Sequence, residues 1–407
     1  MTSQDPTRRS SAKRPLDGIT VVDLTRVLSG PYCTMQLADM GARVIKIERP
    51  GKGDDTREWG PPFINGESAY FLSINRNKES VTLDFKRPEG RELLERLISR
   101  ADIVVENFRP GTLDEIGFGY ASLSARYPKL IYASVSGFGH TGPRREEAGY
   151  DAMTQGEGGL MSITGGGEGA GYKVGVAIVD LVSGMFAAQG ILLALYARER
   201  IGRGQHVDIG MLDAVTALLT YQAGIYFATG VSPTRMGNRH PTVVPYETFR
   251  ASDGDVVLAV GNEGLWKRFC RVAALEELAN DPRFATNRDR VLNYDALTPV
   301  LQHTFRQRTQ EEWIAALTAA GVPCGAVRHI HEVLGDEQLR ARSMIESLHH
   351  PVTGEIRVLG IPVKLSGTPG DIRRPPPRLG EDTECVLKED LGVTASRIAE
   401  LRQAGVI

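Results

Sequence analysis

Short runs rich in β-branched residues alternate with helix-forming segments through the first half of this chain. The runs lie at 19–24, 44–47, 80–85, 103–106, 130–136 and 206–209, and helical segments include 31–40 and 88–99. Such alternation predicts a doubly wound, Rossmann-like α/β domain with a parallel sheet over roughly the first 200 residues. The glycine fingerprint of dinucleotide-binding folds is absent, because the turn after the first run reads TRVLSGP.

The loops that follow these strands are the expected ligand site, because ligands of such sheets bind at the carboxyl ends of the strands. They are rich in glycine, proline and basic residues, as a phosphate-bearing ligand requires. The loops are 26–30, 48–57, 107–111 and 137–143.

The second half of the chain changes character. A helix at 211–228 is followed by a predicted hairpin, 246–251 and 256–261, around the Asp253–Gly254 turn, and then by helical segments. We therefore expect a disordered tail at 1–15, a large α/β domain at 16–231 and a small α+β domain at 232–328. Residues 329–407 would be a linker and a C-terminal segment, whose last helix, 395–404, returns to the large domain.

Composition argues against several classes of protein. The net charge of -2 gives no reason to expect a nucleic acid or a membrane surface as partner. No apolar run reaches the length of a bilayer span, because the stretch that begins at Val174 is interrupted by Asp180, Ser183, Gly184 and Gln189. The basic start lacks an apolar segment and reads as a frayed tail, with an organelle presequence as the alternative. Scattered cysteines and histidines predict no metal site and a reducing, cytoplasmic location.

The stretch 149–200 carries two carboxylates, Asp151 and Asp180, on either side of a glycine-dense loop at 165–171. Asp180 stands at the start of a long helix that has almost no polar face, so we expect this helix to be buried. Asp180 on its own has two interpretations, because an aspartate there could be an N-cap or a reactive group.

Taken together, the motifs resemble the class III CoA-transferases, the family of formyl-CoA transferase, carnitine CoA-transferase and the α-methylacyl-CoA racemases. The resemblance runs from 16 to 407 and rests on stretches such as LDGITVVDLTRVLSGPYC, VENFRPGTLDEIGFGY, IYASVSGFGHTGP, GYDAMTQGEGGLMSITG and RERIGRGQHVDIGMLDA. It implies a homodimer of interlocked subunits. It also implies a CoA thioester and a carboxylic acid as substrates, without a permanently bound cofactor.

The same resemblance implies that Asp180 is the catalytic nucleophile, which attacks the thioester to form first an anhydride and then aspartyl-CoA. A helix N-terminus would favour its ionised form. Asp151 matches a second acidic residue, a glutamate in formyl-CoA transferase, that would orient the nucleophile or bind the acyl group. A plain helix-start aspartate is the alternative.

For CoA, the resemblance points to Arg49, Asn107, Phe108 and the segment that contains Asn75 and Lys78. Arg57 and Arg109 are candidates by charge. Two substitutions depart from formyl-CoA transferase: Leu28 replaces an active-site glutamine, and Glu115 replaces a contact arginine. A third departure is GNRHPTVVP in place of a glycine-only loop.

Three functions remain to be weighed. A transferase is favoured over a racemase because Tyr150 stands where the racemase has its histidine base, and tyrosine is a poor base at neutral pH. A non-catalytic CoA-binding protein would lack Asp180. The stretch GNRHPTVVPYETF resembles that of members acting on dicarboxylates with succinyl-CoA, where Arg239 and His240 would meet a distal carboxylate.

Overall fold

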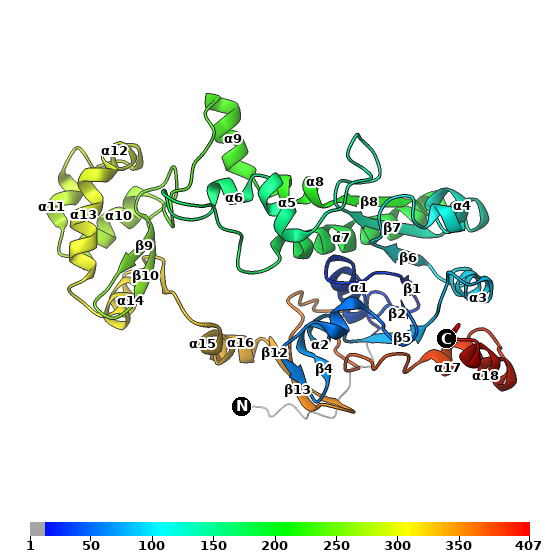
Figure 1. Ribbon diagram of the computed structural model, residues 1–407. Helices are drawn as coiled ribbons and strands as arrows, with labels where there is room; N and C mark the ends of the chain where they lie inside the picture. The colour runs from blue at the N-terminus through cyan, green and yellow to red at the C-terminus, as the bar shows by residue number, and fades with distance from the viewer. Residues whose placement is uncertain (1–12) are drawn as a thin grey trace. The chain divides into compact units, whose positions relative to one another are not determined.

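A sheet of six parallel strands organises the first of two compact units in this computed structural model, which describes residues 13–407. The strands follow the order β5-β2-β1-β6-β7-β8 (Figure 1). They are β1 (Thr20–Asp23), β2 (Arg43–Glu48), β5 (Lys78–Thr82), β6 (Ile103–Glu106), β7 (Ile131–Ser136) and β8 (His206–Gly210). Counted along the chain, this is the 3-2-1-4-5-6 order of a doubly wound sheet, and the predicted α/β fold is confirmed.

Helices and short hairpins complete this unit, which comprises residues 13–159, 174–220 and 337–407 of the described chain. The helices are α1 (Ser29–Asp39), α2 (Ala69–Ile74), α3 (Pro88–Ile98), α4 (Tyr120–Arg126), α5 (Asp151–Glu157), α7 (Ile178–Ile201), α8 (Met211–Ala217), α16 (Glu337–Ala341), α17 (Thr383–Glu389) and α18 (Ala395–Gln403). The hairpins pair β3 (Phe63–Ile64) with β4 (Glu67–Ser68) and β12 (Ile345–His350) with β13 (Gly354–Leu359).

The C-terminal segment shares the core of this sheet. Leu387 of α17 and Ile398 of α18 are buried in one cluster with Val22, Leu94 and Val104. The backbone N–H of Thr82 in β5 also donates to the Thr383 hydroxyl, 2.9 Å away. The predicted last helix is therefore present and packs on the first unit. Of the predicted tail, residues 1–12 lie outside the described residues.

Helix α7 differs from the sequence expectation in two ways. Val179, Ala187 and Ile191 are buried, but Leu192 and Leu193 are exposed, so the helix is not covered on all sides in this chain. Its length and composition also meet the requirement for a membrane span, because Asp180 lies near its start and leaves a long apolar run after it. Such a helix is weak evidence of a membrane, since core helices of soluble proteins have the same composition.

The predicted helix at 211–228 is interrupted. It divides into α8 and α9 (Thr220–Thr229), and Thr220, the first residue of α9, has a φ of 35°. A β-branched residue in this left-handed region ends the regular helical hydrogen bonding.

The second unit comprises Leu160–Lys173 and Tyr221–Asp336. Its antiparallel sheet contains β9 (Tyr246–Arg250), β10 (Asp255–Ala259) and β11 (Cys324–Ala326), which confirms the predicted hairpin. Its helices are α6 (Leu160–Ile163), α10 (Glu263–Val272), α11 (Glu276–Asn280), α12 (Asn287–Leu292), α13 (Tyr294–Phe305), α14 (Gln310–Ala319) and α15 (Ile330–Leu334), with most of α9. Trp266, Phe305 and Trp313 fill its core. The glycine-dense segment 165–171, expected in the large domain, groups with this unit.

Candidate active site

A cavity of about 500 Å³ lies at the carboxyl ends of β1, β6 and β7. The loop after β1 supplies Arg26 and Val27, the loop after β6 supplies Asn107 and Arg109, and Gly137 follows β7. The strand order reverses between β1 and β6, and doubly wound sheets bind ligands at such a reversal. We call this space the reaction cavity.

A second cavity of about 520 Å³ lies beside it, and Arg26, Asp55 and Phe108 line both. Arg49 and Lys86 bring positive charge to the second cavity. Of the loops chosen from the sequence as the ligand site, 26–30, 48–57 and 107–111 line both spaces, and 137–143 reaches only the reaction cavity through Gly137.

Asp180 lines the reaction cavity from the first turn of α7. The N-cap of this helix is Ala177, so the N-cap interpretation of Asp180 is wrong. Burial, with the negative charge of Asp151 adding to it, raises the pKa of Asp180 to about 7. The helix N-terminus was expected to favour the ionised form, but burial and charge repulsion outweigh it.

Asp151, the first residue of α5, caps α7 from a different helix. Its Oδ1 accepts from the backbone N–H of Val179 at 2.9 Å and of Asp180 at 3.4 Å. Its Oδ2 accepts from Nε2 of Gln155 at 2.7 Å, and the Gln155 Oε1 accepts from the N–H of Val174. The carboxylate thus satisfies N–H groups that have no partner within α7, and it fixes the backbone of Asp180.

Gly184, one turn after Asp180, permits the close packing of α7 on α1. A Cβ at this position would lie 2.5 Å from the carbonyl oxygen of Ser29. Because Ser29 lines the reaction cavity, this contact places the start of α1 and the start of α7 on the same space. The first N–H groups of α1 have no partners within the helix, and they can stabilise negative charge there.

The turn that enters α1 is strained. Val27 has a φ of 70°, a left-handed conformation that costs a β-branched residue about 1–3 kcal/mol. The preceding residue, Arg26, is held by the Asn107 amide: the Arg26 N–H donates to Oδ1 at 3.0 Å, and Nδ2 donates to the Arg26 carbonyl at 2.7 Å.

A sequence model described as CoA-transferase family III matches residues 16–383. The chain belongs to this family. Succinyl-CoA:glutarate CoA-transferase of Mus musculus is 39% identical over 402 residues, which cover 99% of this chain and 92% of the mouse protein. Acetyl-CoA:oxalate CoA-transferase of Acetobacter aceti is 42% identical over 385 residues, 94% of this chain and 97% of that protein.

Solved structures agree with this assignment. The crystal structure of a CaiB/BaiF family protein from Brucella suis matches with a TM-score of 0.82 and 43% sequence identity, covering 93% of this chain and 100% of that one. The protein is therefore an enzyme of the CoA-transferase class, and CoA thioesters are its substrates.

The residues predicted to bind CoA fall into two groups. Arg49 is exposed on the second cavity, Phe108 lines both cavities, and Asn107 and Arg109 line the reaction cavity of this family III transferase. Arg57, proposed by charge, instead makes a two-pronged ion pair with Glu48 and stacks on a phenylalanine ring.

Asn75 and Lys78 are fully buried. Nζ of Lys78 lies 3.2 Å from Asp23 and donates to the Asn75 Oδ1 and to the carbonyl of Pro31, both at 2.9 Å. Burial lowers the pKa of Lys78 to about 8. These side chains connect β1, α1 and β5. Their placement in the core disfavours the predicted contact with CoA.

The residues predicted to bind the acid substrate lie in different parts of the structure. Tyr150 lines the reaction cavity and is 67% exposed, whereas Leu28 is buried and lies outside the cavity lining. Arg239 and His240 belong to the second unit. There, the Arg239 guanidinium stacks on Tyr294 at 3.4 Å from the ring centroid, and the His240 ring contacts two tyrosines.

Sequence reasoning missed two aromatic residues. Trp59 lines the reaction cavity, and its ring packs edge-on against Tyr70 with centroids 5.3 Å apart. Burial, followed by the charges of Asp180 and Asp151, raises the pKa of Tyr70 to about 12, so its hydroxyl remains a hydrogen-bond donor near both carboxylates. The sequence signal for Trp59 was a tryptophan directly before a Gly-Pro-Pro turn in a polar loop, and no comparable signal marked Tyr70.

Among residues 13–407, no group of three or more acidic, histidine or cysteine side chains is arranged to hold a metal ion. All four cysteines are free.

Proposed function

We propose that this enzyme moves CoA from succinyl-CoA to a dicarboxylic acid, with Asp180 as the nucleophile. The observation that carries the proposal is a half-buried carboxylate on the wall of the reaction cavity in a family III transferase. Its relatives from Mus musculus and Acetobacter aceti are named for dicarboxylate acceptors, glutarate and oxalate.

In the first half-reaction, an Asp180 oxygen attacks the thioester carbonyl of succinyl-CoA, and the C–S bond breaks to release CoA thiolate. The thiolate then attacks the Asp180 carbonyl of the resulting anhydride, which leaves aspartyl-CoA and expels succinate. In the second half-reaction, the acceptor carboxylate attacks aspartyl-CoA and releases the thiolate again. The thiolate finally attacks the acceptor acyl carbonyl, which forms the new thioester and restores Asp180.

Charge develops on carbonyl oxygens in each of these steps. The N–H groups at the start of α1, beside Ser29, are suited to stabilise it, because fixed donors need no reorganisation. Asp151 holds the backbone of Asp180 and so orients the attacking oxygen. Tyr70 can donate a hydrogen bond near the two carboxylates.

CoA would occupy both cavities. The phosphate-bearing end suits the second cavity, where Arg49 is exposed, and Arg109 offers positive charge in the reaction cavity. Phe108 lines both cavities, and Asn107 lines the reaction cavity beside it. For the acid substrate, Tyr150 borders the reaction cavity. Arg239 and His240, in the second unit, are the groups we propose for recognising a distal carboxylate.

Racemase activity has less support. Among the described residues that line the reaction cavity there is no histidine, and Tyr150 occupies the position before Asp151. A two-base proton transfer needs a second base with a pKa near neutrality.

A homodimer forms part of the proposal. Leu192, Leu193 and Tyr196 lie on one exposed face of α7, and monomers rarely expose such apolar surface. A partner subunit would cover this face. Four free cysteines suit a reducing compartment, so we propose a cytoplasmic location.

The test is a donor and acceptor screen by mass spectrometry. Succinyl-CoA is incubated with glutarate, with oxalate and with valerate, which matches glutarate in length but has one carboxylate. We expect the dicarboxylyl-CoA and free succinate to form in equal amounts, with valerate much slower. Equal rates for glutarate and valerate would exclude recognition of the second carboxylate. Failure of every succinyl-CoA reaction would exclude this donor.

A further inference from the structure

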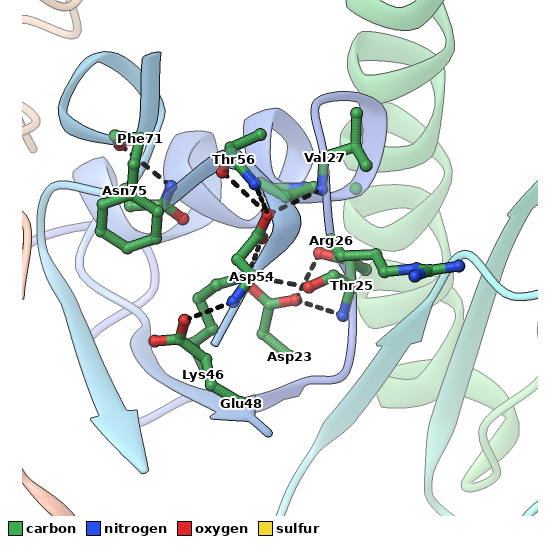
Figure 2. Close-up of polar contacts among 12 residues, drawn as sticks. Asp23, Thr25, Arg26, Val27, Lys46, Glu48, Asp54, Thr56, Phe71 and Asn75 are labelled. Carbon is green, nitrogen blue, oxygen red and sulfur yellow. Dashed lines mark hydrogen bonds and ion pairs between the residues drawn. The ribbon is translucent and has the colours of Figure 1, made fainter. Parts of the chain in front are cut away.

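Three consecutive residues of the turn after β1 are each held by a side chain from elsewhere in the first unit. The Thr25 carbonyl accepts from Nζ of Lys46 at 2.8 Å. Arg26 is held by the Asn107 amide, as described above. The Val27 N–H donates to Oδ1 of Asp54 at 3.2 Å, and Figure 2 shows this carboxylate pointing at the turn.

Asp54 is itself rigidly placed. It forms a 2.8 Å ion pair with Lys46, and the two side chains are only 1% and 0% exposed. Its Oδ1 also accepts from the backbone N–H of Thr56 at 3.0 Å and from the Thr56 hydroxyl at 2.8 Å (Figure 2). Although burial opposes ionisation, Lys46 and Thr56 hold the pKa of Asp54 at about 2. The carboxylate is therefore ionised at neutral pH.

This arrangement explains how the strained turn persists. A left-handed β-branched residue needs its surroundings to fix it, and Asp54 binds the N–H of that residue. Val27 and Ser29 border the reaction cavity together with Asp180, while Asp54 and Lys46 border the second cavity. Neither Asp54 nor Lys46 takes part in the proposed chemical steps.

We propose that Asp54 is a positioning residue for CoA transfer, which acts through Val27 by holding the wall of the reaction cavity at the geometry that Asp180 requires. The inference rests on the proposed function. A wall displaced by about 1 Å would misplace the thioester carbonyl and slow the chemical step more than it weakens binding.

The experiment compares Asp54→Asn in two backgrounds, the parent and Val27→Gly. Asparagine keeps the shape, but its single acceptor oxygen cannot serve both Lys46 and the Val27 N–H, so one of these two contacts is lost and the turn should relax. In the parent background we expect kcat to fall about 10²-fold with KM for the CoA thioester within about threefold. Because glycine adopts a positive φ without strain, Asp54→Asn should cost less than about threefold when residue 27 is glycine.

Asp39→Asn is the matched control. Asp39 also makes a buried ion pair, 2.7 Å from Arg76, but none of its described bonds reaches the turn. We expect it to lower the melting temperature and leave the kcat of the folded enzyme unchanged. Equal kcat losses from Asp54→Asn in both backgrounds, or the same loss from Asp39→Asn, would show that Asp54 is only a stabilising residue.

A crystal structure of Asp54→Asn gives an answer that does not depend on activity. We expect Val27 to leave the left-handed region, and an unchanged φ would overturn the inference. If the parent enzyme transfers no CoA from any donor, the proposed function fails, and the conformation at residue 27 still decides whether Asp54 holds the turn.

Discussion

At the scale of single residues, the role proposed for Asp180 requires its ionised form, yet its surroundings oppose ionisation. Burial and Asp151 raise its pKa to about 7. At neutral pH about half of the carboxylate is then charged. A carboxylate that is poorly solvated is also a stronger nucleophile, so the same environment that limits the charged fraction favours attack.

Replacing Asp180 by asparagine should abolish transfer and leave binding intact. The amide keeps the shape but cannot form the anhydride, so we expect a rate loss beyond about 10⁴-fold, the upper range for a general acid–base residue. Calorimetry with the CoA thioester should give a parental affinity. Asp295→Asn, an exposed first-turn aspartate on α13, is the control and should behave like the parent. Near-parental transfer by Asp180→Asn would exclude it as the nucleophile.

The pH dependence of transfer should report the pair Asp151 and Asp180. Because the ionised form reacts and its pKa is raised, the rate of the free enzyme should increase with pH through about 7 and level off above. Asp151→Asn removes the repelling charge, which should move this midpoint to lower pH. A rate profile from pH 5 to pH 9 measures it, and an identical midpoint in both proteins would contradict the coupling.

At the scale of elements, the packing of α7 on α1 determines where Asp180, the proposed nucleophile, lies. The two helices start at Ile178 and Ser29, far apart in sequence, and meet where Gly184 has no side chain. The Asp151 carboxylate of α5 then caps α7. Contacts between helices therefore place the N-terminal ends of α1, α5 and α7. The helix propensity of each segment alone does not determine these contacts.

Gly184→Ala should therefore damage the active site through the fold. Its Cβ would lie 2.5 Å from a backbone oxygen that cannot move away cheaply. We expect destabilisation of about 1–3 kcal/mol and a lower kcat, read by thermal unfolding and steady-state kinetics. Gly224→Ala on α9 is the matched helical control: a Cβ there meets nothing within 4 Å, so stability should be unchanged or slightly higher. Equal effects of the two changes would refute the packing argument.

At the scale of the whole molecule, the exposed apolar face of α7 supports the proposed homodimer. Leu193 is 61% exposed and Tyr196 60% in the single chain. Covering such side chains contributes about 25 cal/mol for each Å² of apolar surface. If the subunits interlock, separation also requires a chain to open, so dilution should not release a folded monomer.

Sedimentation at nanomolar concentration tests the dimer. The parent should remain dimeric and active, and Leu193→Glu should lower the yield of dimer because it buries a charge at the interface. Leu292→Glu, at a leucine on α12 that is even more exposed than Leu193, is the control for the change in surface charge. A folded, active monomer of the parent would refute the interlocked arrangement while leaving the role of Asp180 untouched.

The sequence by itself determined the parallel sheet, the hairpin of the second unit and the ligand loops, because hydrophobic period and turn residues are local signals. Its family motifs also selected Asp180 and Asp151, which the structure brings together at the start of α7. It misjudged the extent of α7 burial, since apolar composition does not say which face the chain itself covers. It also selected Asn75 and Lys78 as CoA contacts. The residues around them in the motif do not indicate that both side chains are buried in the core.

Only the tertiary structure decided the environment of Asp180, the proposed nucleophile. The raised pKa of Asp180 depends on burial and on a carboxylate 29 residues earlier in the chain. The strained Val27 depends on Asp54, 27 residues later. Charge, burial and strain are set by distances in space, and those distances arise only when β1, α1, α5 and α7 have packed together.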